Sequence, residues 1–116
     1  MVSDNRAGIL RVSMLMYDAG LAARSLDEIR SCLRLDPDDK GCREHYGKVK
    51  VLVKAINDAQ QFSDDEKWHK CLTSANRVLE LGGRIPEYML QGKKLVCHCG
   101  ARVSSLTLVY LFFAFL

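Results

Sequence analysis

The sequence is poor in the residues that interrupt regular structure. It contains two prolines and eight glycines among 116 residues, and 48% of its residues are apolar. This composition excludes a collagen-like chain and a disordered, low-complexity segment. The five cysteines are an odd number and too sparse for a small scaffold built from disulfides. The length fits one domain or a piece of a longer protein.

Clustered charge is also absent. Seventeen Lys and Arg residues against fourteen Asp and Glu residues give a formal net charge of +3, without a long basic run. Nucleic acid is therefore not the expected partner. The first residues, Met1 to Arg6, lack the apolar stretch of a signal peptide. Taken as a complete chain, the sequence would thus predict a cytoplasmic protein.

Apolar residues recur with the period of an α-helix, and no stretch alternates as a strand does. The clearest stripe, from Trp68 to Leu79, has apolar residues at i, i+3, i+4, i+7, i+10 and i+11. Similar patterns predict helices over 4–18, 40–61 and 86–99, and another that ends at Leu35. Gly20 and Gly82-Gly83 are expected helix ends, and Pro86 an expected first helical position. The sequence predicts an all-α chain of antiparallel helix pairs.

Two helix starts carry a possible capping box, in which a serine precedes a glutamate by three residues. Ser63 and Glu66 have this spacing just before the helix that contains Trp68. Ser25 and Glu28 have it too, but residues 22–24 also have a helical pattern. The second helix therefore begins either near residue 22 or at Ser25.

Small residues at fixed offsets suggest a repeated helical hairpin. The first copy has small or turn residues at Ser13, Gly20, Ser25 and Pro37, with apolar residues at Met16, Ile29 and Cys32. This pattern resembles the tetratricopeptide repeat. A shift of 46 residues gives a looser second copy, formed by Ala59, Phe62, Cys71, Ala75, Val78 and Gly83. A helical hairpin unrelated to that family is the alternative.

The resemblance implies an α-solenoid fragment of tetratricopeptide-repeat helical hairpins, with about two and a half repeats. The repeats would span residues 6–39, 40–83 (an extended copy) and 84–100 (a partial copy). Residues 101–116 form a divergent apolar C-terminal tail, and ten of the eleven residues from Leu106 to Leu116 are apolar. As a helix, those eleven residues would reach only about 16 Å, roughly half a bilayer core, so we expect no membrane span.

Longer strings are similar to one group of tetratricopeptide proteins, the endoplasmic-reticulum co-chaperones also described as protein-kinase inhibitors. The strings include Ser25–Asp36, His45-Tyr46 and Val96–Cys99, and the similarity covers about residues 6–100. It implies a non-catalytic segment in the lumen of the endoplasmic reticulum that acts in the unfolded-protein response. Its partners would be an unfolded client, an eIF2α-type kinase or an Hsp70 chaperone. A tetratricopeptide scaffold that binds a partner peptide and is not a chaperone is the alternative.

The repeat register also predicts a concave binding surface, lined by the first helix of each repeat. It would include Leu10, Met14, Tyr17, Val53, Ile56 and Gln60. A clamp for a peptide carboxylate is disfavoured, because Leu10 and Met14 stand where such a clamp has Lys and Asn. Alternatively, Leu10 and Met14 pack against a preceding repeat.

No arrangement of residues predicts catalysis or a cofactor. The sequence has no His-Pro-Asp motif of a J domain and no glycine-rich phosphate loop. Cys97-His98-Cys99 could suggest zinc, but neighbouring helical residues point about 100° apart and no second ligand pair is present. His45 and His69 are distant in sequence from any nucleophile constellation. We expect a protein that is not an enzyme and binds neither metal nor cofactor.

One disulfide is expected, between Cys32 and Cys42. They flank the turn at Asp36-Pro37, and a chain reversal there can bring their Cα atoms within about 4.4–6.8 Å. The similar co-chaperones match this segment at both cysteines, and a bridge suits an oxidising compartment. Alternatively, Cys32 is a buried thiol and Cys42 an exposed one. Cys71 is expected in the core, and Cys97 and Cys99 have no evident partner.

Overall fold

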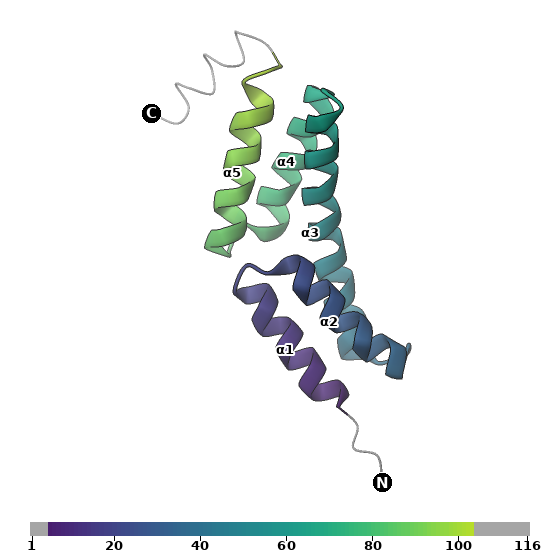
Figure 1. Cartoon of the computed structure of the whole chain (residues 1–116). Coiled ribbons are helices and arrows are strands. Elements are labelled where there is room, and N and C mark those ends of the chain that lie inside the picture. Colours follow the sequence, from purple (N-terminus) through teal and green to yellow (C-terminus); the bar gives the residue numbers. More distant parts are fainter. Residues whose placement is uncertain (1–4, 104–116) are drawn as a thin grey trace. The chain divides into compact units, whose positions relative to one another are not determined.

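The computed structural model describes residues 5–103, which contain helices and no strand (Figure 1). The described helices, in chain order, are α1 (Arg6–Asp18), α2 (Ala22–Leu35), α3 (Lys40–Asp64), α4 (Trp68–Gly82) and α5 (Pro86–Gly100). The predicted all-α fold is confirmed. Of the predicted tail, residues 104–116 lie outside the described part of the chain. None of the helices within residues 5–103 combines the length and apolar character needed to cross a membrane.

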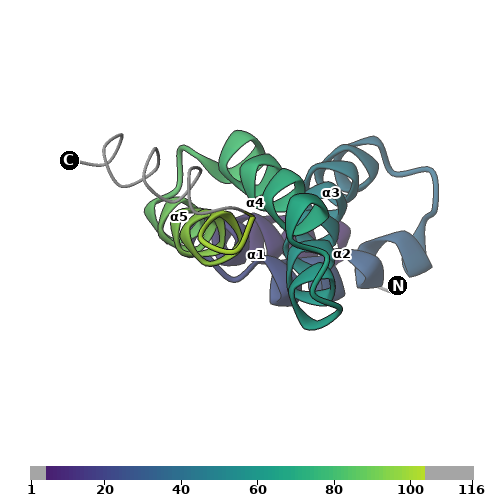
Figure 2. The same cartoon turned by 90° about the horizontal axis from the view of Figure 1, so that it is seen from above.

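The chain divides into two compact units, residues 1–53 and 54–116. The first unit holds α1, α2 and the start of α3, and α1 packs against α2. The second unit holds the rest of α3 with α4 and α5, and α5 packs alongside α4 (Figure 2). The boundary falls inside α3, whereas the predicted repeats divide the chain at its turns. The repeat boundaries at 39/40 and 83/84 therefore stay a prediction from the sequence pattern.

Each unit has its own apolar core, formed by the faces that the helical periodicity marks. In the first unit the stripe of α2 is buried against α1, and its central residue Ile29 is fully buried. In the second unit the stripe of α4 is buried against α5. The buried apolar side chains of α4 and α5 are Cys71, Ala75, Val78, Tyr88, Val96 and Cys99. At Gly82 a side chain would not fit, because a Cβ there would lie 2.6 Å from Cβ of Tyr88.

Helices α1 and α3 end in the same way. After α1, the Leu21 amide donates to the Met16 carbonyl and the Gly20 amide to that of Tyr17. This is the Schellman arrangement, which needs a left-handed residue, and Gly20 supplies it with φ of 87°. After α3, the amides of Lys67 and Glu66 donate to the carbonyls of Phe62 and Ser63 in the same pattern.

The predicted capping box at Ser63 and Glu66 is wrong, and of the two starts left open for the second helix the structure has the one near residue 22. Ser63 lies in the last turn of α3, and Glu66 is the left-handed residue after it, with φ of 58°. The serine–glutamate spacing therefore marks the end of one helix and not the start of the next. Ser25 is a buried residue inside α2, which begins at Ala22. Pro86 does stand at the start of α5, as predicted.

Glu66 offers a direct test of this arrangement. It follows Gly20 by 46 residues and takes the left-handed backbone conformation that favours glycine. We expect Glu66→Gly to raise the free energy of unfolding by about 1 kcal/mol, because a residue with a Cβ is strained there. Urea denaturation followed by circular dichroism measures the change.

The matched control is Glu44→Gly, which places the same substitution at an exposed site inside α3. It should lower stability by about 0.5–1 kcal/mol, since glycine is unfavourable within a helix. If both variants were destabilised equally, the left-handed position of Glu66 would be contradicted.

Candidate protein-binding site

The first unit is held together where α1 and α2 approach through two serines. The Ser13 hydroxyl donates to the Ser25 carbonyl oxygen at 2.7 Å, and the Ser25 hydroxyl donates to the Ser13 carbonyl oxygen at 2.7 Å. Both side chains are fully buried. Larger residues would separate the helices, so the small residues that the repeat pattern requires set the distance between α1 and α2.

His45 of α3 completes this buried network. Its Nε2 atom lies 2.9 Å from Oγ of Ser13 and 3.1 Å from Oγ of Ser25. Each serine has one hydroxyl proton and donates it to the opposite carbonyl, so Nε2 must carry the proton that reaches the two oxygens. The network therefore selects the neutral tautomer of His45 with hydrogen on Nε2, and ties α3 to the α1–α2 pair.

The surroundings of His45 disfavour its charged form. Burial lowers the pKa of His45 below its ordinary value of 6.5, and the nearby Lys48 lowers it further. The backbone of Ser13 and the carboxylate of Asp18 act in the opposite direction but do not outweigh burial. The Tyr17 and His45 rings are nearly perpendicular, with centroids 6.0 Å apart, and Lys48 Nζ lies 4.6 Å from the centroid of the Tyr17 ring.

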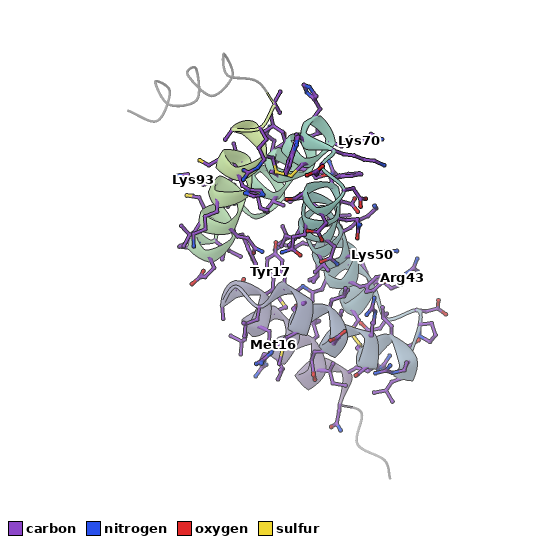
Figure 3. All side chains as sticks on the ribbon, turned by 45° about the horizontal axis from the view of Figure 1, so that its top comes forward. Met16, Tyr17, Arg43, Lys50, Lys70 and Lys93 are labelled. Carbon is purple, nitrogen blue, oxygen red and sulfur yellow. A yellow bond between two sulfur atoms is a disulfide. The ribbon has the colours of Figure 1, made fainter. Side chains whose placement is uncertain are left out.

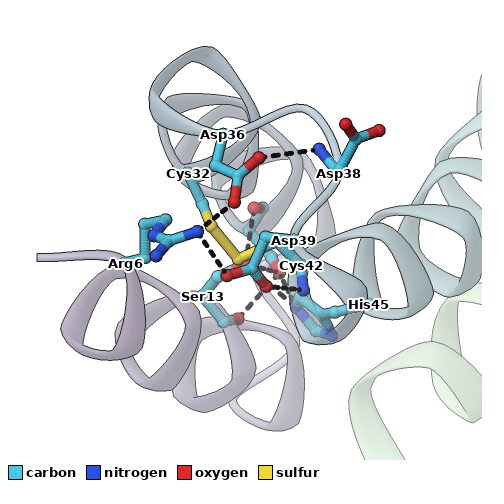
Figure 4. The surroundings of a disulfide bond; sticks show 9 residues. Arg6, Ser13, Cys32, Asp36, Asp38, Asp39, Cys42 and His45 are labelled. Carbon is cyan, nitrogen blue, oxygen red and sulfur yellow. Dashed lines mark hydrogen bonds and ion pairs between the residues drawn. A yellow bond between two sulfur atoms is a disulfide. The ribbon is translucent and has the colours of Figure 1, made fainter. Parts of the chain in front are cut away.

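A disulfide and an ion-pair cluster hold the turn between α2 and α3 (Figure 4). The structure joins the Sγ atoms of Cys32 and Cys42, with Cα atoms 6.3 Å apart, as the sequence analysis predicts for this pair. Arg6, at the start of α1, contacts the carboxylates of both Asp36 and Asp39. Asp39 also accepts the backbone N–H of Cys42 at 2.9 Å, and so caps α3.

The second unit repeats the serine contact with different residues. Ala59 and Cys71 follow Ser13 and Ser25 by 46 residues, and Sγ of Cys71 lies 3.3 Å from the Ala59 carbonyl oxygen. The 46-residue register thus marks a close helix contact in both units. Where the first unit has hydroxyls and a histidine, the second has an alanine and a cysteine.

The expectation that Cys99 has no partner is wrong. The structure joins Cys99 to Cys71, with Cα atoms 5.7 Å apart, and leaves Cys97 as an exposed free cysteine. Cys71 is in the core, as expected, but as half of a bridge. A signal was present: the apolar stripe of α5 runs through Tyr88, Gly92 and Val96 and continues to Cys99, which places Cys99 on the buried face.

The predicted concave surface is only partly accessible. Tyr17 is 2% exposed and Ile56 is 9% exposed, so both side chains belong to the core and add little to an accessible surface. Both were assigned from the repeat register, which does not show how deeply a helix is covered. The four other predicted residues, which are at least partly exposed, are Leu10, Met14, Val53 and Gln60.

Helix α1 exposes three large apolar side chains, of which the repeat register marks Met14 alone. Leu15 is 63% exposed, Met14 48% and Val12 42%. Arg11 and Asp18 are the charged residues on the same exposed side of the helix. Such a concentration of apolar surface on one helix is typical of a site that binds other proteins.

The described residues contain one group of potential metal ligands. Only Cys32, Asp39 and Cys42 bring three metal-ligand atoms within 4.8 Å of one another in residues 5–103. Both sulfur atoms are used by the disulfide, and the Asp39 carboxylate is occupied by Arg6 and the Cys42 amide. The chemistry of this cluster is structural: it holds α1 and the α2–α3 turn together.

Paired antiparallel helices with small residues at the contact, repeated along the chain, define a tetratricopeptide-repeat segment. The tetratricopeptide-repeat domain of P58(IPK) has the same fold, with a TM-score of 0.81 and 33% identity over 88% of this chain. In sequence, this segment is homologous to part of DnaJ homolog subfamily C member 3. The identity is 35% over 97 residues for both the mouse and the human protein. A co-chaperone of Mycosarcoma maydis with tetratricopeptide repeats and a J domain is 30% identical over 70 residues.

These similarities cover most of this chain but a small part of its relatives. The alignment with the mouse and human proteins spans 84% of this chain and 19% of each relative. The structural match covers 28% of the P58(IPK) chain. No family model matches the sequence. The comparisons therefore identify the kind of repeat and its homologues.

The buried imidazole predicts a dependence of stability on pH. The pKa of His45 is lower in the folded than in the unfolded chain, so the unfolded state binds more protons below the ordinary value of 6.5. The contribution of His45 is complete above pH 6.5 and is lost as the pH falls toward the folded pKa. We expect the free energy of unfolding, measured with urea at a series of pH values, to fall over that interval.

His45→Gln should reduce this pH dependence, because glutamine does not titrate. It should also lower the free energy of unfolding at pH 7, because the two serine hydroxyls lose the Nε2 donor that lies between them. The exposed His69 provides the matched control, and His69→Gln should leave the slope with pH unchanged. An equal slope in the wild type and in His45→Gln would contradict the role of His45.

The cysteine pairing predicts a distinct labelling pattern. After refolding in an oxidising buffer and unfolding without reductant, an alkylating reagent should modify Cys97 and leave the four other cysteines unmodified. Peptide mass spectrometry should then find the pairs Cys32–Cys42 and Cys71–Cys99. Cys97→Ser should remove all labelling, whereas labelling of Cys71 or Cys99 in the wild type would contradict the second pair.

Proposed function

We propose that this chain is a non-catalytic, protein-binding repeat segment of a co-chaperone that holds unfolded client protein. The observation that carries the proposal is the exposed apolar side of α1, where Val12, Met14 and Leu15 are each more than two-fifths exposed. Apolar side chains that an unfolded client exposes would be buried against this surface. Methionine suits such a site because its flexible side chain can adapt to different clients.

The homology supports a role in co-chaperone function. The Mycosarcoma maydis relative is by name a co-chaperone with tetratricopeptide repeats and a J domain, and the other relatives are by name DnaJ homologs, of which this chain aligns with 19%. In our proposal the segment binds client, and ATP-dependent steps belong to a J domain and an Hsp70 partner. An eIF2α-type kinase is a further proposed partner, in keeping with a role in the unfolded-protein response.

The cysteines support a location in the lumen of the endoplasmic reticulum. Four of the five cysteines are paired in the structure. Disulfides persist in oxidising compartments and are rare in the cytosol of mesophiles. Each unit contains one bridge, so both units of the segment would benefit from an oxidising environment.

The test is suppression of aggregation by the purified chain without ATP. The segment should delay the aggregation of a reduced, unfolded client, followed by light scattering. Met14→Asp together with Leu15→Asp should raise the concentration of the segment needed for the same protection about tenfold. The reason is that two charges are placed on the apolar surface. Both residues are exposed, so the helices should still form, as circular dichroism can show.

The matched control is Leu35→Asp, which introduces a charge at an equally exposed leucine at the end of α2. Its protection should equal that of the wild type. If the double variant protected the client as well as the wild type does, the apolar side of α1 would not be the client site. If the wild type did not protect at all, the alternative of a peptide-binding scaffold that is not a chaperone would be favoured.

A further inference from the structure

A second surface of the first unit has a different chemistry. A groove of about 650 Å³ lies between α2 and α3, open to solvent, and all of its lining residues belong to residues 1–53. Three arginines, a tyrosine and two apolar residues line it, and no acidic side chain is part of the lining. The lining residues are Arg30, Leu33, Arg34, Pro37, Arg43 and Tyr46.

The positive side chains form two rows that follow the helix period. On α2, Arg30 and Arg34 are four residues apart and lie on one face. On α3, Arg43 and Lys50 are seven residues apart with Tyr46 between them, and Figure 3 shows Arg43 and Lys50 on the same side of the helix. Nζ of Lys50 lies 5.5 Å from the centroid of the Tyr46 ring, which extends the positive row past the groove.

Little negative charge opposes these side chains. Arg30 contacts Asp27 at 3.3 Å in an exposed pair, and such pairs contribute little. Arg34 donates to the hydroxyl of Ser31 at 3.0 Å, which leaves its charge uncompensated. Within residues 5–103 no ion pair of Arg43 is found. Pro37 lies between Asp36, which pairs with Arg6, and Asp38. The lining itself carries three arginines and no carboxylate, and a negative ligand would neutralise that charge.

We propose that this groove binds an internal acidic segment of a partner protein in extended conformation. Arginine forks match the two oxygens of a carboxylate, and the charge-assisted bonds are stronger than neutral ones. Arg30 and Arg34 are separated by about 6 Å along the helix axis, close to the ~7 Å between alternate residues of an extended chain. Leu33, Pro37 and the Tyr46 ring supply apolar contact for a side chain between the acidic residues.

This site is separate from the client surface proposed above. The groove uses α2 and the start of α3, whereas the client surface is the exposed side of α1. The two proposals can therefore fail independently.

The experiment measures binding of a defined acidic peptide to the full chain. The probe is a fluorescein-labelled peptide of about twelve residues, with Glu at alternate positions, two central Leu residues and both termini blocked. Fluorescence anisotropy gives the Kd. A second peptide with Gln in place of every Glu keeps the shape without the charge and should not bind measurably.

Two variants with the same change in charge test the location. Arg34→Glu with Arg43→Glu reverses the charge of the groove, and we expect the Kd to rise about tenfold or more. Arg11→Glu with Arg24→Glu changes two exposed arginines of the first unit outside the groove, and should keep the Kd within about twofold. Met14→Asp with Leu15→Asp should also bind the peptide as the wild type does.

Three results would overturn the proposal. The first is a wild type that does not bind the acidic peptide. The second is an equal loss of binding in both arginine variants, which would indicate general electrostatic attraction. The third is displacement of the labelled peptide by single-stranded RNA at a lower concentration than the unlabelled peptide requires, with a dependence on Arg34 and Arg43. This result would identify the groove as a nucleic-acid site.

Discussion

Close contact between small side chains is the constraint on which both units depend. Two helices can pack so closely that a side chain of one touches the backbone of the other. This is possible only where both residues at the contact are small. Ser13 with Ser25, and Ala59 with Cys71, meet this requirement 46 residues apart. The larger apolar residues then fill the space on either side of each contact, and their burial supplies most of the stabilising free energy.

Units of this size need additional links. Each has roughly half of the chain and buries too little apolar surface to be strongly stable by itself. The two bridges close segments with sequence separations of 10 and 28 residues. Because each bridge reduces the conformational entropy of the unfolded chain, the two bridges raise the free energy of unfolding by about 3 and about 4 kcal/mol. These values are a large share of the stability of a small domain. Each bridge links the second helix of a small-residue contact to the next helix along the chain, α2 to α3 and α4 to α5.

The two surfaces of the first unit differ in what they offer a partner. The exposed side of α1 is apolar and has no row of matching charges, which suits clients that share little sequence. The groove between α2 and α3 has fixed positive groups at regular intervals, which suits a ligand of defined charge pattern. A repeat segment with both could hold unfolded chain and a specific partner without competition between them.

Much of this protein is determined by local sequence. Helical periodicity, Gly20 and Pro86 are sufficient to predict the helices and most of their ends, because these signals act within a few residues. The Cys32–Cys42 pair is also local, since it flanks one turn.

Tertiary structure decided the rest. Apolar residues occur on all sides of α1, so its period alone could not show that Tyr17 is buried and Leu15 is exposed. The Cys71–Cys99 bridge and the groove both depend on how neighbouring helices are rotated about their axes, and that rotation is set by packing between residues distant in sequence.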